Sequence, residues 1–256
     1  MKTRLLSWSL LLAFLYACAP PRPQVPQPEV PAGPLIQAIE QRREAFQSLK
    51  AVAKVAVERR GRVRVYESVA IVQRGQDRLR IEGVGPLGQP LFVLLWDGSD
   101  VLLQDANQGE PRRMGPAALE GVLGVALSPA ELCAVLSGNV SAQPPDAAAR
   151  AGCRNDGRCM VELQSGDARR LVTLAPPSRG PENGALIESV DRYEGNALVF
   201  RSRFALPGRV GGYRLPQRIV IENPDRRISV TVQYEDVEVN VPVEDEAFVL
   251  SGEDVQ

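Results

Sequence analysis

Histidine is absent from this chain of 256 residues. Its absence excludes the Ser-His-Asp and Cys-His arrangements of hydrolases and any metal site with a histidine ligand. The carboxylates stand at turns or on the polar faces of strands, where solvated charge is common. The glycine clusters at 121–124 and 208–212 do not connect a strand to a helix with a lysine in place, as a phosphate loop would. The sequence offers no catalytic residue, and we expect a binding protein without a cofactor, not an enzyme.

An excess of basic residues is also missing. Lys and Arg number 30, Asp and Glu 31, and the formal net charge is −1. Aromatic residues make up only 5% of the chain, and no basic run is interleaved with them. Nucleic-acid binding needs a basic surface that can neutralise phosphates, so we expect no nucleic-acid partner.

Cysteine occurs only four times, one of them at Cys18. Cys153 and Cys159 flank a turn-rich stretch of five residues, and an exported domain can keep a disulfide there. Cys133 lies in an apolar helical stretch and reads as a buried small hydrophobic residue. Its pairing with either of the other two stays open. These cysteines do not have the spacing of a zinc finger, and the chain has no histidine that could complete a set of ligands. We therefore expect no metal site.

The longest apolar run stands at the N-terminus. Lys2 and Arg4 precede Leu5–Ala17, a run too short for an ordinary membrane span and typical of a secretory signal. It ends in Leu15-Tyr16-Ala17-Cys18, which resembles the bacterial lipoprotein signal box. The resemblance implies cleavage before Cys18 and acylation of that cysteine.

A proline-dense stretch follows and reaches Pro34. Such a tract forms a semi-rigid, extended spacer. Ala19 stands where aspartate would resemble the inner-membrane retention signal of enteric bacteria, which points to the outer membrane. We therefore expect a signal peptide (1–17), a lipidated cysteine with its spacer (18–34) and one domain (35–256) that faces the periplasm.

The domain pattern changes from helical to strand-like. Leu35–Leu49 has helical spacing, and most of the later segments alternate with period two. Two short helices interrupt the strands: one opens at Pro116 and ends at Gly124, and the other begins with the capping box Ser128–Glu131 and ends at Gly138. We expect strands at 54–58, 62–65, 76–82, 91–96, 99–105, 160–164, 170–174, 186–193, 197–204, 217–222, 227–234 and 236–241.

These segments predict a mainly β (α+β) domain. Its core is one strongly curved antiparallel sheet of about eleven strands, an incomplete barrel whose short helices cover the concave side. In the segment from Gln76 to Pro90, Leu79 and Ile81 alternate with charged residues before the chain enters a loop. That loop, Gly85-Pro86-Leu87-Gly88, carries an unshielded leucine. A single surface leucine needs no explanation by itself.

The chain resembles the LolB family of outer-membrane lipoprotein receptors. The resemblance rests on Gly75–Arg80, Gly85–Gly88, Leu119–Gly138 and Leu215–Ile221 followed by Arg227–Val230. It implies an incomplete barrel around a hydrophobic cavity, which takes acylated lipoprotein from a LolA-like periplasmic carrier. The exposed leucine that this family needs to place cargo in the membrane corresponds to Leu87.

The resemblance also implies which side chains line the cavity, and that the receptor works as a monomer held at the outer membrane by its lipid. Two alternatives stay open: a LolB-like binder of another lipid, and a structural envelope lipoprotein with a filled core. The inward residues that we expect in the cavity are Leu79, Ile81, Val93, Leu95, Leu123, Leu132, Leu136, Phe200, Ile219, Ile221, Val230 and Val232.

Overall fold

The computed structural model describes residues 25–106, 110–141, 147–176 and 185–250. The predicted signal segment and Cys18 lie outside the described residues. The expected spacer is only partly an extended segment, since Glu29–Val30 forms β1 and helix α2 (Ala32–Glu44) begins before residue 35. A Cβ on Gly152 would lie 1.9 Å from the carbonyl oxygen of Pro26, so the incoming chain packs directly on the sheet. The folded domain therefore starts earlier than predicted.

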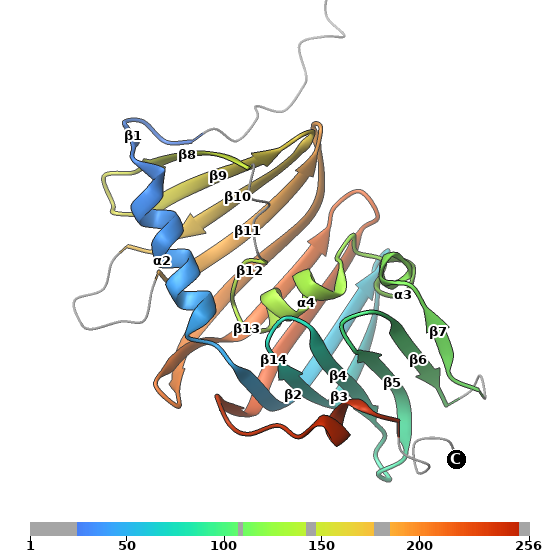
Figure 1. Cartoon of the computed structure of the whole chain (residues 1–256). Coiled ribbons are helices and arrows are strands. Elements are labelled where there is room, and N and C mark those ends of the chain that lie inside the picture. The colour runs from blue at the N-terminus through green and yellow to red at the C-terminus, as the bar shows by residue number, and fades with distance from the viewer. Residues whose placement is uncertain (1–24, 107–109, 142–146, 177–184, 251–256) are drawn as a thin grey trace, which may run out of the picture.

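The strands form one 14-stranded antiparallel sheet, which confirms the predicted fold class. Two meanders, β8 to β14 and β2 to β7, lie side by side because β14 pairs with β2, and β1 extends the edge at β8. The sheet curves without closing into a barrel (Figure 1). The remaining strands are β2 (Ser48–Arg59), β3 (Arg62–Arg74), β4 (Arg78–Val84), β5 (Pro90–Trp96), β6 (Val101–Asp105), β7 (Arg112–Met114), β8 (Ala148–Cys153), β9 (Cys159–Ser165), β10 (Ala168–Leu174), β11 (Ile187–Glu194), β12 (Ala197–Val210), β13 (Tyr213–Asn223) and β14 (Ile228–Val239).

Bulges bend several strands. The two segments expected at 227–234 and 236–241 are one strand, β14, with an irregularity between Tyr234 and Asp236 where it pairs with β2. A second bulge, between Ala53 and Val55, lies in the pairing of β2 with β3. Each extra residue increases the local twist and changes which side chains face inward. The curvature thus arises within long strands, not at breaks between them.

Helix α2 covers one half of the concave face, where it lies against β8 and β9 (Figure 1). Ile39 is buried in the core, and Phe46 follows the helix into the same cluster. The helix was expected to reach Leu49, but it ends at Glu44. Leu49 instead belongs to β2, where it is fully buried. An apolar residue at this spacing fits either a helix or a strand, so the boundary could not be read from periodicity.

The other half of the concave face is covered by the predicted helical patch. A 3-10 turn, η2 (Pro116–Ala118), leads into α3 (Leu119–Leu123), which ends at Gly124 with a φ of 75°. Glycine suits this left-handed position because it has no Cβ to clash. Helix α4 (Pro129–Leu136) starts at the predicted capping box of Ser128 and Glu131. In Figure 1, α4 lies across the inner side of the sheet.

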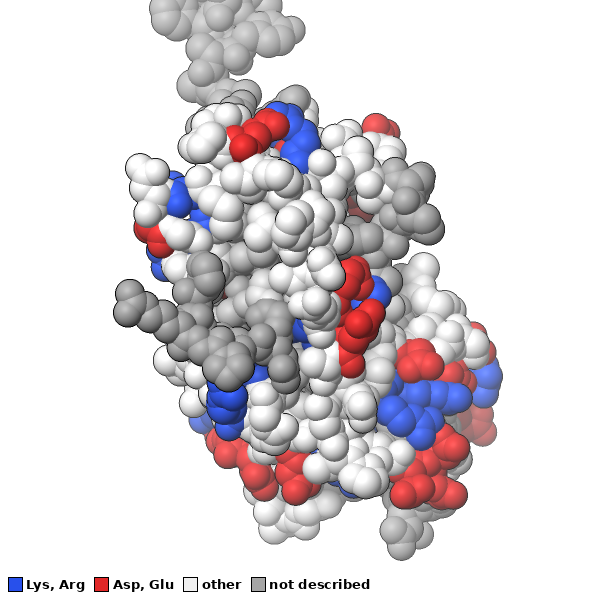
Figure 2. Space-filling view, turned by 60° about the vertical axis from the view of Figure 1, so that its left-hand side comes forward, with Lys and Arg blue, Asp and Glu red and all other residues white. Residues whose placement is uncertain are grey.

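A last 3-10 turn, η3 (Asp245–Phe248), lies on the outer side near β4. There the guanidinium of Arg74 is 5.5 Å from the centre of the Phe248 ring, and Arg80 donates to the carbonyl of Val249. On the face that Figure 2 presents, basic and acidic side chains lie in small mixed groups separated by uncharged surface. No helix in the described ranges is long and apolar enough to cross a membrane.

Candidate ligand cavity

A cavity of about 600 Å³ lies between the α3–α4 segment and the concave side of the sheet. This volume is typical of small-molecule and lipid sites. The covering segment contributes Val122, Leu123, Val125, Leu127, Leu132 and Leu136. The apolar residues from the sheet are Val55, Val57, Val63, Tyr66, Val69, Ile71, Ile81, Phe92, Leu94, Leu103, Ile221, Val230 and Val232. The charged lining residues are Arg59, Arg62, Arg64 and Asp105, and a mainly apolar hollow of this size can hold a hydrophobic ligand.

Part of the predicted set lines this cavity. The residues placed there are Ile81, Leu123, Leu132, Leu136, Ile221, Val230 and Val232. Leu79, Phe200 and Ile219 face the same side of the sheet but belong to the packed core. Leu79 pairs across the strands with Gln73, whose amide donates to the carbonyl of Cys133 in α4 at 3.0 Å. The helix lies directly on the sheet at that point, so no hollow remains.

Val93 and Leu95 were expected in the cavity but point to the opposite face. In the register of β4 and β5, Ile81 lies opposite Leu94, so Phe92 and Leu94 are the inward residues of β5. All of Leu91–Trp96 is apolar, so alternation gave no signal to choose between the faces. This ambiguity concealed Phe92 and Leu94, and Leu103 of β6, which pairs with Leu94, lines the cavity beside them.

The bulge in the β2–β3 hairpin turns arginine side chains toward the mouth of the cavity. Ala53 pairs with Val69, but two residues later Val55 pairs with Tyr66, so the inward positions of β3 change from odd to even numbers. Arg62 and Arg64 therefore line the mouth of the cavity, where Val63 also touches it but is 62% exposed. Apolar and polar residues do alternate in this segment. Because of the bulge, however, the polar residues face the concave side of the sheet, where hydropathy alone would place the valines.

The loop between β4 and β5 holds Leu87 out in solvent, with 92% of its surface exposed. Gly85 N donates to Gln89 O at 2.8 Å and Gly88 N to Gly85 O at 2.9 Å. Leu87 N donates to the side-chain oxygen of Gln89 at 3.0 Å. Pro86 completes a turn that these bonds fix in shape. The leucine is therefore presented by an ordered loop next to β5, the strand whose Phe92 lines the cavity.

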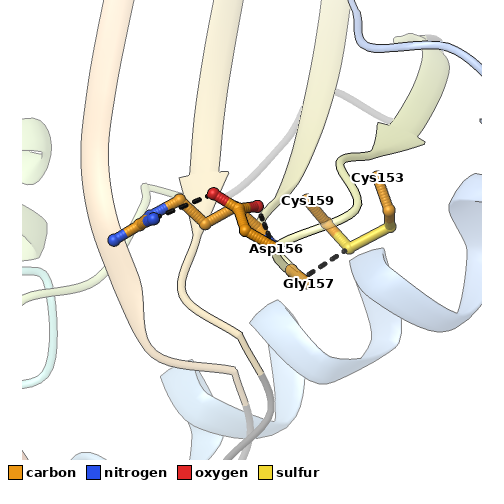
Figure 3. The surroundings of a disulfide bond; sticks show 5 residues. Cys153, Asp156, Gly157 and Cys159 are labelled. Carbon is orange, nitrogen blue, oxygen red and sulfur yellow. Dashed lines mark hydrogen bonds and ion pairs between the residues drawn. A yellow bond between two sulfur atoms is a disulfide. The ribbon is translucent and has the colours of Figure 1, made fainter.

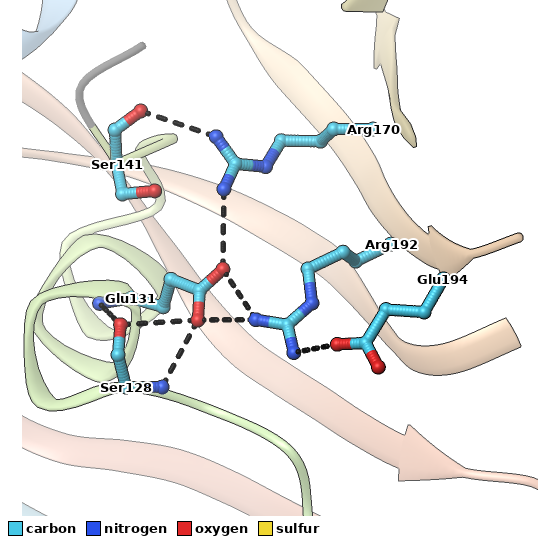
Figure 4. A network of polar contacts seen from close by, with 6 residues as sticks. All are labelled: Ser128, Glu131, Ser141, Arg170, Arg192 and Glu194. Carbon is cyan, nitrogen blue, oxygen red and sulfur yellow. Dashed lines mark hydrogen bonds and ion pairs between the residues drawn. The ribbon is translucent and has the colours of Figure 1, made fainter. Parts of the chain in front are cut away.

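The N-terminal end of the covering helix is fixed by a buried charge cluster (Figure 4). Glu131 accepts from Ser128 N at 2.9 Å, from Arg192 at 2.7 and 2.9 Å and from Arg170 at 3.1 Å. Burial by itself would raise the pKa of Glu131, but the Ser128 hydrogen bond and the two guanidinium groups outweigh it and hold the pKa below its ordinary value. Burial lowers the pKa of Arg170. Since Arg170 and Arg192 stand on β10 and β11, the cluster ties α4 to the sheet.

The C-terminal end of α4 is fixed by side chains that bind its last carbonyl groups. Tyr234 donates to Leu136 O at 2.8 Å, Tyr213 to Ser137 O at 3.1 Å and Arg42 to Gly138 O at 3.1 Å. Arg42 is buried, and its guanidinium lies 4.7 Å from the centre of the Tyr213 ring. A cation near a helix C-terminus is favourable, because the carbonyl ends carry partial negative charge. The cover is therefore anchored at both ends.

The disulfide joins Cys153 and Cys159, across the mouth of the β8–β9 hairpin (Figure 3). Inside the enclosed turn, the Asp156 carboxylate accepts from Arg158 N at 3.0 Å. Cys133 is a free, buried thiol of α4, as expected from its apolar surroundings, and burial raises its pKa. Among the described residues, no group of three or more acidic or thiol side chains is placed to hold a metal ion.

Comparison with known proteins gives a likeness in structure alone. The sequence matches no known protein-family profile. No curated protein matches it either. A LolA superfamily protein from Nitrosomonas europaea superposes with a TM-score of 0.59 at 14% identity, covering 84% of this chain and 97% of the other. A DUF1329 family protein from Desulfovibrio piger gives 0.60 at 14% identity and covers 87% and 99%.

A third structure, described as an outer membrane lipoprotein-sorting protein domain from Vibrio parahaemolyticus, gives a TM-score of 0.59 at 13% identity and covers 84% and 94%. At these identities the similarity concerns the fold. The superpositions cover 84–87% of this chain and 94–99% of the other chains, so the correspondence extends over most of the fold. The chain thus shares its fold with LolA superfamily proteins.

Proposed function

We propose that this chain is a LolB-like lipoprotein of the outer membrane. It binds the acyl chains of other lipoproteins in its cavity, accepts them from a LolA-type periplasmic carrier and inserts them into the outer membrane. The observation that carries the proposal is the apolar cavity of about 600 Å³ under α3 and α4. The lipid anchor at Cys18, outside the described residues, remains a prediction from the signal sequence.

The transfer involves binding without covalent chemistry. Each methylene of an acyl chain that leaves water for the cavity contributes about 0.8 kcal/mol. A carrier with a similar cavity offers nearly the same gain, so the direction depends on a small difference between the two. Every ~1.4 kcal/mol changes the transfer equilibrium tenfold. A modest difference between the two cavities in the residues that line them is therefore enough to move cargo toward the membrane.

Leu87 has the properties of a membrane contact in this scheme. Its side chain meets no neighbour that would bury it, and the bonds of Gly85 and Gln89 hold the loop in shape. Entry of this leucine into the lipid surface would place β5, and with it the cavity wall at Phe92, beside the bilayer. Acyl chains could then leave the cavity without crossing much water.

Two other functions share the fold. In one, the same cavity holds a different lipid or hydrophobic ligand; in the other, the protein is a structural component of the envelope. The hollow between Val230 and Leu123 supports the ligand-binding alternatives over the structural one, because a purely structural core would be filled to normal packing density.

The test uses the chain from Ala19 onward, which contains the continuous sheet and core of the described residues. A LolA-type carrier loaded with acylated lipoprotein is mixed with it, and cargo transfer is measured by pull-down. Liposomes are then added to measure release. We expect cargo to move to the wild-type chain, and we expect Leu87→Glu to accept cargo but to release at least tenfold less of it.

Matched variants separate the steps. Leu206→Glu changes another exposed leucine, 65% exposed at the far end of β12, and should release cargo normally. Val230→Phe fills the cavity and should prevent cargo uptake while leaving the fold intact. Uptake by Val230→Phe at the wild-type level, or equal loss of release in Leu206→Glu and Leu87→Glu, would contradict the proposal.

A further inference from the structure

The mouth of the cavity is basic although its interior is apolar. The lining residues that are exposed to solvent are Arg59, Arg62, Val63 and Arg64, all at the β2–β3 hairpin. Asp105, on β6, is the acidic residue in the lining. We call these exposed residues of the hairpin the rim of the cavity. The bulge at Ala53/Val55 creates the rim, because without the bulge the valines of this segment would face inward. The bulge thus places Arg62 and Arg64 at the cavity mouth and leaves Val63 and Val65 exposed to solvent.

Two of the three arginines at the cavity mouth, Arg62 and Arg64, are available for a ligand. Arg59 donates to the carbonyl of Val122 at 2.9 Å, which holds its guanidinium beside the covering segment. Arg64 lies 5.1 Å from the centre of the Tyr66 ring, itself part of the cavity wall. Neither Arg62 nor Arg64 forms an ion pair with any residue in the described ranges.

We infer that this cavity also takes an anionic lipid. Its acyl chain lies among the apolar side chains, and its carboxylate or phosphate lies against Arg62 and Arg64. The planar guanidinium donates paired hydrogen bonds that match both groups, and an apolar wall on one side strengthens the attraction compared with open water. The inference rests on acyl-chain binding in the proposed function. It adds a second class of ligand, for which an acidic head group is required, beside the uncharged lipid of an acylated cysteine.

The test compares two ligands that have the same acyl chain but differ in the charge of the head group. A fluorescent fatty acid and its methyl ester are titrated, below their micelle concentrations, into the chain from Ala19 onward at pH 7.5 and 50 mM salt. We expect the acid to bind at least tenfold more tightly than the ester. This advantage should shrink severalfold at 500 mM salt, because salt screens exposed charges, whereas the ester affinity should not fall.

Two double variants with the same charge change provide the control. R62Q/R64Q should reduce acid affinity about tenfold and change ester affinity less than twofold. R209Q/R218Q removes two exposed arginines, neither in the cavity lining, and should behave as wild type. Equal affinities for acid and ester, or equal losses in the two double variants, would overturn the charge requirement alone. Binding of neither ligand would instead refute the acyl-chain cavity of the proposed function.

Discussion

The Glu131 carboxylate accepts two hydrogen bonds from Arg192 Nη1, at 2.9 and 2.7 Å, although the two residues belong to a short covering helix and a distant strand. This contact, with those of Ser128 and Arg170, fixes the helix that closes the cavity over the sheet. Helix α4 is therefore held against the sheet, and the solvent-exposed part of the cavity lining lies at the β2–β3 hairpin. The arrangement leads to predictions about stability and about the shape of the cavity.

Replacing Glu131 by Gln should destabilise the protein by about 3 kcal/mol, because removal of one partner from a buried charge cluster leaves the other charges unpaired. Urea denaturation followed by circular dichroism measures the loss. Glu194→Gln is the control: Glu194 also binds Arg192, at 3.0 Å, but is 60% exposed, so its loss should cost less than about 1 kcal/mol. Equal losses would show that the Glu131 cluster is not the anchor described above.

The Asp97 carboxylate closes the β5–β6 turn, where it accepts from Ser99 N and Asp100 N at 2.9 and 2.8 Å. The hydrogen bond from Asp100, joined by those from Ser99, lowers the pKa of Asp97 from 3.8 to about 2. Since the folded pKa lies below the unfolded one, the stability from this group is fully present above pH 3.8 and is lost as the pH falls through about 2.

Two measurements check this expectation for Asp97. An NMR titration of its carboxyl carbon should give a midpoint near pH 2. The stability difference between wild type and Asp97→Ala should narrow as the pH is lowered from 5 toward 2. A midpoint at the ordinary value of 3.8, with a pH-independent difference, would contradict the hydrogen-bonded turn.

Gly83→Ala should distort the cavity wall. A Cβ at this position would lie 2.3 Å from the Phe92 ring, which packs edge to face on Tyr66 with 5.3 Å between the ring centres. Overpacking of this kind costs about 1–3 kcal/mol, and ligand affinity should fall because both rings line the cavity. Gly121→Ala is the control: nothing lies within 4 Å of its added Cβ, and alanine favours α3 by about 0.5–1 kcal/mol. Urea denaturation of both variants measures the change in stability, and fatty-acid titration measures the change in ligand affinity.

Cys133 should report on the integrity of the covering helix. Its thiol is fully buried, and burial raises its pKa. In the folded state a reagent therefore cannot reach the sulfur, and the reactive thiolate does not form. In the chain from Ala19 onward, a thiol reagent should modify no cysteine natively and one cysteine in urea, with Cys153 and Cys159 held in their disulfide. Rapid labelling without denaturant would mean that α4 leaves the sheet spontaneously.

Much of the architecture follows from local chemistry. Period-two alternation in segments such as Arg227–Tyr234 requires a strand with two unlike faces, and many such segments without long helices require a large antiparallel sheet. The capping box of Ser128 and Glu131, the glycine stop at Gly124 and the hairpin between Cys153 and Cys159 depend only on neighbouring residues. The bare Leu87 in a glycine- and proline-rich loop is equally visible in the sequence, since nothing beside it could bury it.

Tertiary structure decided which residues meet a ligand. The bulge opposite Ala53 reverses the inward face of β3, and the uniformly apolar β5 hides its register, so alternation could name neither Arg62 nor Phe92. Whether an inward residue lines a hollow or a packed core depends on the position of α4 above it: Ile81 faces the cavity, while Leu79 lies under the contact of Gln73 with the helix. The sequence determines the two faces of a strand only where polar and apolar residues alternate and no bulge intervenes. The hollow depends on volumes summed over segments far apart in the chain, which only the assembled fold brings together.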